Sequence, residues 1–184
     1  MIHSEPSTFR LAGPADSRGI AALHAASWRA HYRESLKPSY LDGPIDDERA
    51  AVWATRLSRP DPRQLVLLVE AGGEVLGFAC AFTDDDPVWG TLIDNLHVRV
   101  DRKGAGLGRA LVGHLARHLA SRGPDQPVHL FVLAVNVAAQ GFYDRIGGRQ
   151  VERDNHVTPD GSSNPVIRYA WDSPAALIEA TVGR

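Results

Sequence analysis

The 184-residue sequence predicts an α+β domain whose elements follow the order βααβββαβαββ. Apolar runs of strand length, such as residues 65–69 and 128–135, alternate with longer segments in which apolar residues recur at helical spacing. The turn Ala71-Gly72-Gly73-Glu74 joins two strand-like runs in the manner of a hairpin. The length favours a single domain over residues 1–184 with an adequate core.

The first half of the sequence predicts two helices between a short first strand and three longer ones. Residues 9–12 form the first strand, and apolar side chains recur at helical spacing from Ile20 to Tyr32. The acidic residues 46–48 suit the first turn of a second helix, because negative charge there complements the helix dipole. Prolines at 60 and 62 end that helix, and the longer strands are expected at 65–69, 75–82 and 91–98.

The second half predicts a long amphipathic helix, one further strand–helix step and a closing pair of strands. The helix runs from about Gly106 to Ser121, with Leu107, Leu111, Val112, Leu115, Ala116 and Leu119 on one arc. The opposite face is expected to carry Arg109, Gly113, Arg117 and Ser121. The remaining elements are a strand at 128–135, a helix at 137–145, strands at 148–156 and 165–172, and a tail from Ser173 that is compatible with a helix.

The composition is that of an ordinary globular protein and argues against several classes. A net charge of −2 leaves no dominant basic face, so nucleic acid is not expected as the main partner. No segment has the roughly 18 apolar residues of a membrane span. Cys80 is the single cysteine and cannot form an internal disulfide, so we expect a cytoplasmic protein. His114 and His118 lack the glutamate of a zinc-protease helix, and no metal site is expected.

The most informative segment is residues 96–111, where a strand-like run leads through a short glycine-rich turn into a helix. The first amides of a helix lack intrahelical partners and lie at the positive end of its dipole, which is an arrangement that binds phosphate or pyrophosphate. A P-loop is excluded because Gly108 is followed by Arg109-Ala110, and the glycine spacing does not fit a dinucleotide fingerprint. The glycines and basic residues of the turn are Arg102, Lys103, Gly104, Gly106, Gly108 and Arg109.

Two motifs make the sequence resemble the GNAT superfamily of N-acetyltransferases. The family's acetyl-CoA loop, Arg/Gln-x-x-Gly-x-Gly/Ala after a Leu-x-Val strand, is matched by residues 103–108 behind Leu96 and Val98, with Lys103 in the place of Arg or Gln. The second motif is matched by Asn136-Val137-Ala138-Ala139-Gln140-Gly141-Phe142-Tyr143 and the glycines after it. The motifs stand in the expected order, about 30 residues apart as the intervening helix and strand require. The resemblance covers about residues 9–172, which we take as the core of the domain.

The resemblance implies a GNAT acyl-CoA N-acyltransferase fold, with a mixed, mostly antiparallel sheet and helices on both faces. In that fold the strands at 96–98 and 128–135 run parallel and splay apart, and the pantetheine arm of acetyl-CoA pairs with the backbone in the gap. Asn136 is expected to bind the cofactor or to cap the helix that follows it. The cofactor-binding residues implied are Leu96, His97, Val98, Lys103, Gly104, Ala105, Gly106, Leu107, Gly108, Arg109, Asn136 and Tyr143.

The resemblance also suggests catalytic residues. Tyr143 is the candidate for stabilising or protonating the departing thiolate, although reference pKa values of about 10 and about 8.5 make full proton transfer uphill. For the general base we favour Asp94 over His97, and solvent deprotonation of the amine remains an alternative. Strict alternation along the strand would place Asn95 and His97 on the face opposite Asp94.

The expected function is transfer of acetyl from acetyl-CoA to a primary amine of a small molecule or peptide by direct attack. The segment Ser27-Trp28-Arg29-Ala30-His31-Tyr32 resembles a pattern at the end of the first helix in bacterial members, so Trp28, His31 and Tyr32 are candidates for acceptor contacts. The alternatives are a non-catalytic acyl-CoA-binding or sensing domain and transfer of a longer acyl group. A monomer or a homodimer is expected.

Overall fold

The computed structural model describes residues 6–123 and 125–182, which contain a seven-stranded sheet. Its order is β1-β2-β3-β4-β5-β7-β6, and neighbouring strands are antiparallel except β4 and β5, which run parallel. The predicted mixed, mostly antiparallel α+β fold is confirmed. The strands are β1 (Thr8–Leu11), β2 (Gln64–Ala71), β3 (Glu74–Asp86), β4 (Gly90–Val98), β5 (Val128–Leu133), β6 (Arg149–Val157) and β7 (Ser163–Trp171).

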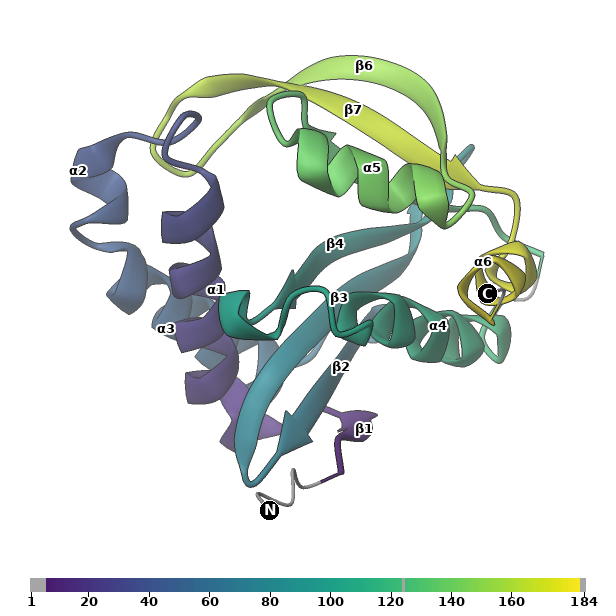
Figure 1. Cartoon of the computed structure of the whole chain (residues 1–184), viewed down its shortest axis with the longest axis horizontal. Coiled ribbons are helices and arrows are strands. Elements are labelled where there is room, and N and C mark those ends of the chain that lie inside the picture. Colours follow the sequence, from purple (N-terminus) through teal and green to yellow (C-terminus); the bar gives the residue numbers. More distant parts are fainter. Residues whose placement is uncertain (1–5, 124, 183–184) are drawn as a thin grey trace.

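Helices cover both faces of the sheet (Figure 1). On one face, Ile20 of α1 and Trp53 of α3 share a buried cluster with Phe78 of β3. On the other face, Leu111 of α4 shares a larger buried cluster with Leu67 of β2. The helices are α1 (Ser17–His31), α2 (Pro38–Leu41), α3 (Ile45–Ser58), α4 (Leu107–Ala120), α5 (Val137–Arg145) and α6 (Pro174–Val182), with short 3-10 helices at Pro14–Asp16 and Val100–Arg102.

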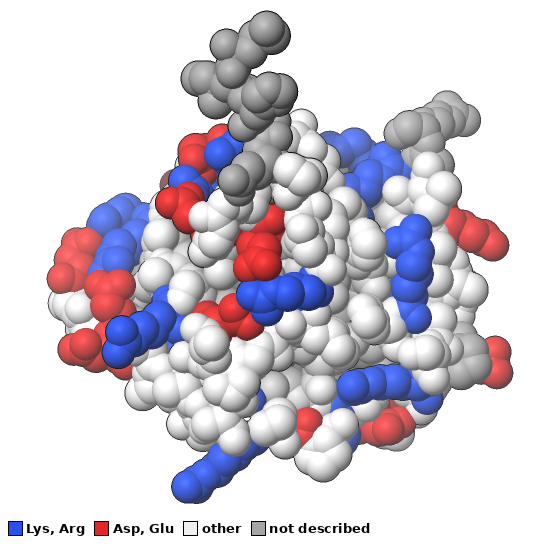
Figure 2. Space-filling view, turned by 90° about the horizontal axis from the view of Figure 1, so that it is seen from below, with Lys and Arg blue, Asp and Glu red and all other residues white. Residues whose placement is uncertain are grey.

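The face of the molecule that Figure 2 shows carries both signs of charge. On the face that Figure 2 shows, Lys and Arg side chains lie among Asp and Glu side chains rather than in one basic surface. Among the helices of residues 6–123 and 125–182, none is long and apolar enough to cross a membrane.

The C-terminal helix α6 packs on the face of α4 that lies opposite the predicted apolar arc. Gly113 is buried there, and a Cβ at that position would lie 2.8 Å from Oγ1 of Thr181. The Arg109 guanidinium donates hydrogen bonds to the carbonyl oxygens of Ala180 (2.7 Å) and Thr181 (3.0 Å). The helical pattern of α4 places Gly113 and Arg109 opposite the apolar arc, but it carries no information about a helix that packs on that face later in the chain.

The parallel strands β4 and β5 diverge, and this divergence positions the functional site. They pair only at Thr91–Val128 and Leu92–His129, near the start of each strand. A register shift between β3 and β4 leaves Asp94 as the additional residue of a β-bulge. Since a bulge bends and twists its strand, the second half of β4 turns away from β5 and leaves backbone groups of both strands facing a gap.

Candidate functional site

A cavity of about 680 Å³ lies between the diverging strands. The end of α1, the loop before α4, the start of α4 and the helix α5 complete its wall. Its volume is in the range of sites for small molecules and cofactors. It is lined by every predicted site residue except Ala105: Trp28, His31, Tyr32, Asp94, Leu96, His97, Val98, Lys103, Gly104, Gly106, Leu107, Gly108, Arg109, Asn136 and Tyr143.

One end of the cavity is the glycine-rich loop that begins α4. Gly104 and Gly106 have φ values of +79° and +80°, in the left-handed region that other residues rarely adopt. A Cβ at either position would meet nothing within 4 Å, so the backbone is open to a ligand there. The first amides of α4 follow at once, and Arg102 and Lys103 stand beside them. This donor set fits a pyrophosphate.

Arg109 has a different environment from the one that the loop pattern suggests. It lines the cavity, but its guanidinium reaches the carbonyl oxygens at the end of α6. The side chain thus anchors the phosphate-loop helix to α6. The backbone amide of Arg109 lies within the first turn of α4, where helix amides are available to bind an anion.

Asn136 caps α5. Its Oδ1 accepts a hydrogen bond of 3.1 Å from the backbone amide of Ala139, which satisfies one of the free donors of the helix. The same residue lines the cavity at the point where β5 turns into α5. Asn136 therefore caps α5, and its place in the cavity lining also allows it to contact a cofactor.

Tyr143 is almost fully buried, with 9 % of its surface exposed, and lines the cavity from α5. Its ring packs edge-on against Phe142 and Trp171 and at a tilt against Tyr169. Burial, with smaller contributions from Tyr32 and Tyr169, raises the pKa of Tyr143 above its ordinary value. A tyrosine in this environment donates a hydrogen bond readily but holds its proton firmly.

Asp94 lies at the bulge of β4, on the side of the sheet that α3 covers. Arg56 of α3 donates hydrogen bonds from one nitrogen, Nη1, to Oδ2 of Asp94 (2.8 Å) and to Oδ1 of Asn95 (3.2 Å). Asp94 and Asn95 therefore face the same arginine, and the expectation that they lie on opposite faces is wrong. The bulge interrupts the alternation that the expectation assumes.

His97 is buried on the α1 side of β4. Its Nδ1 lies 2.8 Å from Oγ of Ser27 on α1. Behind it, His24 accepts a hydrogen bond of 3.0 Å at Nδ1 from the indole of Trp53. Burial first, and then the charges of His31, Lys103 and Arg49, lower the pKa of His97 to about 3, so its imidazole is neutral near pH 7.

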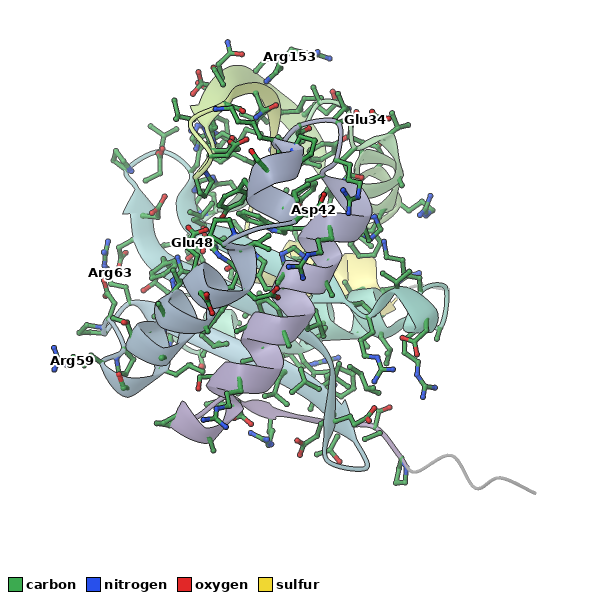
Figure 3. All side chains as sticks on the ribbon, turned by 90° about the vertical axis from the view of Figure 1, so that its left-hand side faces the viewer. Glu34, Asp42, Glu48, Arg59, Arg63 and Arg153 are labelled. Atoms are coloured by element: carbon green, nitrogen blue, oxygen red, sulfur yellow. The ribbon has the colours of Figure 1, made fainter. Side chains whose placement is uncertain are left out.

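Aromatic residues of α1 and α2 pack together beside the cavity. The Trp28 ring packs against Tyr32 and Tyr40, and the Arg49 guanidinium lies 4.8 Å from the Trp28 ring centroid. Figure 3 views the side of the molecule that α1, α2 and α3 form and labels Glu48, which accepts hydrogen bonds from Tyr40 and Arg49. These pairings hold the short helix α2 against α3.

The turn between β6 and β7 reaches the segment between α1 and α2. The backbone amide of Lys37 donates a hydrogen bond of 2.7 Å to Oδ2 of Asp160, and Lys37 Nζ donates one of 2.9 Å to the Asp160 carbonyl. Figure 1 shows this turn beside the α1–α2 segment. Two segments that are far apart in the sequence thus meet at this contact.

Several residues of the site escape the sequence-based prediction. Phe131 of β5 and Arg145 of α5 line the cavity, and Arg56 of α3 donates hydrogen bonds to the lining residues Asp94 and Asn95. Arg145 lies inside the second motif, and its basic charge could have marked it as a residue that contacts an anionic ligand. Lys37, Arg56 and Asp160 lie in segments whose partners only the folded chain identifies.

The chain belongs to the acetyltransferase (GNAT) family, whose acyl donor is acetyl-CoA. The model of that family matches residues 23–148, which include both motifs and most of the cavity wall. The predicted family is therefore confirmed.

Two relatives show how far the similarity extends. The chain is 33% identical over 132 residues to a mycothiol acetyltransferase of Streptomyces coelicolor, in a match that covers 72% of this chain and 39% of that protein. It is 31% identical over 150 residues to an L-methionine sulfoximine/L-methionine sulfone acetyltransferase of Pseudomonas aeruginosa, covering 76% of this chain and 78% of the relative. The chain thus spans about two fifths of the length of the mycothiol enzyme.

Solved structures share the fold. The PaiA N-acetyltransferase of Thermoplasma acidophilum, in complex with coenzyme A, superposes with a TM-score of 0.70 at 14% identity, covering 90% of this chain and 99% of that one. A GNAT acetyltransferase of Desulfovibrio desulfuricans gives a TM-score of 0.70 at 15% identity, covering 91% and 99%. At these identities the similarity establishes the fold.

Proposed function

We propose that this chain transfers the acetyl group of acetyl-CoA to a primary amine of a small molecule or peptide. The observation that carries the proposal is the layout of one cavity along β4. Its lining offers the glycine loop, Arg102 and Lys103 to a pyrophosphate, and it also includes Asp94, His97 and Tyr143. On the side of β4 that faces β5, Leu96 and Val98 present unpaired backbone to an extended, amide-bearing ligand.

Acetyl-CoA, when bound, supplies an activated acyl group and a thiolate leaving group. The loop amides and Lys103 fix the phosphate end, and the backbone of residues 96–98 orients the arm by strand-like hydrogen bonds. Tyr143 donates a hydrogen bond to the sulfur on which negative charge develops. Because its pKa is raised, we assign Tyr143 the role of a hydrogen-bond donor that retains its proton.

We propose Asp94 as the group that accepts the amine proton. Its Oδ2 is held by Arg56, which leaves Oδ1 to receive the proton directly or through one water molecule. His97 is less suitable as a base because its lowered pKa makes its protonated form unfavourable. We infer that His97 acts as a neutral hydrogen-bonding wall of the cavity, oriented by Ser27.

The acceptor is proposed to be a small amine. The names of the two relatives, a mycothiol acetyltransferase and an L-methionine sulfoximine/L-methionine sulfone acetyltransferase, support an acceptor of that size. The free, buried thiol of Cys80 is consistent with work in a reducing cytoplasm.

The test combines calorimetric titration of acetyl-CoA with a panel of primary amines in which free thiol is followed. Micromolar binding together with thiol release for one class of amine supports the proposal. Binding without release for any amine favours a non-catalytic acyl-CoA-binding protein, and faster release from propionyl- or succinyl-CoA favours a longer acyl donor. Absence of binding overturns the assignment of the glycine loop.

A further inference from the structure

Lys103 of the phosphate loop touches His31 at the end of α1. Lys103 Nζ and His31 Nε2 are 2.7 Å apart, although the residues are 72 positions apart in sequence. A lysine ammonium has donors only, so it is the donor of this hydrogen bond and Nε2 of His31 is the acceptor. The imidazole must then be neutral, with its proton on Nδ1. The contact exists only while His31 is uncharged.

The surroundings keep the pair in that state when no anion is present. Partial burial first, and then the charge of Lys103, lower the pKa of His31 below its usual value. Partial burial also lowers the pKa of Lys103. The pair therefore carries a single positive charge near neutral pH, and a proton added to His31 would place two cations in contact.

The groups that share the cavity with His31 do not offset that repulsion. His97 faces it from β4 as a neutral ring, and Tyr32 follows it at the end of α1 with a raised pKa. The remaining titratable groups that line the cavity are Asp94, Arg102, Arg109, Tyr143 and Arg145, of which only Asp94 is a carboxylate, and it is already paired with Arg56.

We propose that His31 belongs to the phosphate-binding end of the site and takes up a proton when the pyrophosphate of the cofactor binds between it and Lys103. This inference rests on the proposed function, since it takes the ligand to be a CoA thioester. Each cation then donates to an anion oxygen instead of to the other residue, and the proton comes from the buffer. The assignment moves His31 from the expected acceptor contacts to the cofactor site.

The sign of the coupling follows from the charges. An anion beside His31 favours its charged form and raises its pKa from the lowered value of the free protein. Protons are therefore taken up on binding at pH values between the free and bound pKa of His31. The affinity for the cofactor should weaken as the pH rises through the bound value, and above it the uptake should disappear.

The experiment is calorimetric titration of the protein with coenzyme A at pH 6.5 and 8.5, in buffers of different ionisation enthalpy. The slope of the observed enthalpy against the buffer enthalpy gives the number of protons taken up. At pH 6.5 the unmodified protein should take up at least about half a proton more than His31→Gln, because an unperturbed histidine titrates near pH 6.5. The variant should bind coenzyme A about fivefold more weakly at pH 6.5 and nearly equally at pH 8.5.

Two controls isolate His31. His118→Gln makes the same change on α4 outside the cavity lining, and it should behave like the unmodified protein. Titration with 3′-dephospho-CoA removes the phosphate monoester, whose own second pKa of about 6 would otherwise contribute. The ring nitrogen resonances of His31, followed by NMR with and without coenzyme A, report its protonation without any substitution.

The outcomes separate the two proposals. Greater proton uptake by the unmodified protein, with a ring-nitrogen shift toward the protonated form, supports the role of His31. Binding of coenzyme A with equal uptake in the unmodified protein and His31→Gln overturns that role and leaves the proposed function standing. If coenzyme A fails to bind the unmodified protein, both proposals fall.

Discussion

Lys37 and Asp160 are 123 residues apart in the sequence, yet the backbone amide of the first donates a 2.7 Å hydrogen bond to the carboxylate of the second. Thr158 and Ser162 donate to the same carboxylate. Burial would raise the pKa of Asp160, but the hydrogen bonds from Lys37, Thr158 and Ser162 outweigh it and hold the pKa well below its usual range. The contact joins the α1–α2 segment to the turn between β6 and β7.

The first prediction is that Asp160→Ala raises the KM for the acceptor about tenfold and leaves coenzyme A affinity unchanged, because the variant loosens two loops that we propose to orient the acceptor. The measurement is steady-state kinetics with the amine found in the panel, alongside calorimetry. Asp154→Ala makes the same change at an exposed position of β6 and serves as the control. Equal acceptor KM values in the two variants would count against the role of the contact.

The second prediction concerns Tyr143. Tyr143→Phe should lower kcat at least about tenfold with little change in coenzyme A affinity, because it removes one hydrogen bond to developing negative charge. Tyr169→Phe is the matched control: it removes a hydroxyl that donates to Asp144 and lies outside the cavity lining. Turnover should stay within about twofold in the control, and unchanged turnover in Tyr143→Phe would remove the proposed role.

The third prediction tests the base. Asp94→Asn keeps an oxygen for Arg56 but cannot accept a proton, so kcat/KM should fall about a hundredfold and lose its dependence on an acidic group. The measurement is the pH–rate profile between pH 5 and 9. Arg56→Gln keeps the carboxylate while removing its partner, and it should retain the shape of the profile. A profile unaltered in Asp94→Asn would point to solvent as the base.

The fourth prediction concerns stability. Since the pKa of His97 is lowered to about 3 in the folded protein, the unfolded chain binds more protons between about pH 6.5 and pH 3. Stability is therefore complete above pH 6.5 and falls with decreasing pH, by up to about 1.4 kcal/mol per pH unit for this histidine. Urea unfolding at pH 5 and 7 measures the fall, and His97→Gln should show a smaller one. An equal fall in both proteins would contradict the assignment.

The fifth prediction concerns backbone strain at Gly106 of the glycine-rich loop. Gly106→Ala adds a methyl group that meets nothing within 4 Å, so its cost comes from the φ of +80° and amounts to about 1–2 kcal/mol. Gly13→Ala adds a methyl group in equally open space at a φ of −123°, and it should be nearly neutral. Chemical denaturation of the two variants gives the comparison. Coenzyme A affinity should fall in Gly106→Ala alone.

The sequence predicts the order of the main strands and helices because their hydrophobic periodicity is local. It also predicts the phosphate loop, since the glycines, the basic residues and the helix start are contiguous. The bulge at Asp94 was not predictable, because a one-residue shift of register leaves no mark on the pattern of a single strand. The contacts of Lys103 with His31 and of Lys37 with Asp160 depend on the meeting of distant segments, and only the fold supplies that.

The packing of α6 on α4 also sets the limits of a minimal catalytic unit. The family match ends at residue 148, but a truncation there or before Pro174 would uncover the buried Gly113 and remove the carbonyl groups that hold the Arg109 guanidinium. Because Arg109 belongs to the first turn of α4, such a truncation would remove the contacts that hold the start of this helix, and with it the proposed anion site, in place. Fragments designed for expression, or for transplanting this domain into another chain, should therefore extend at least through Val182.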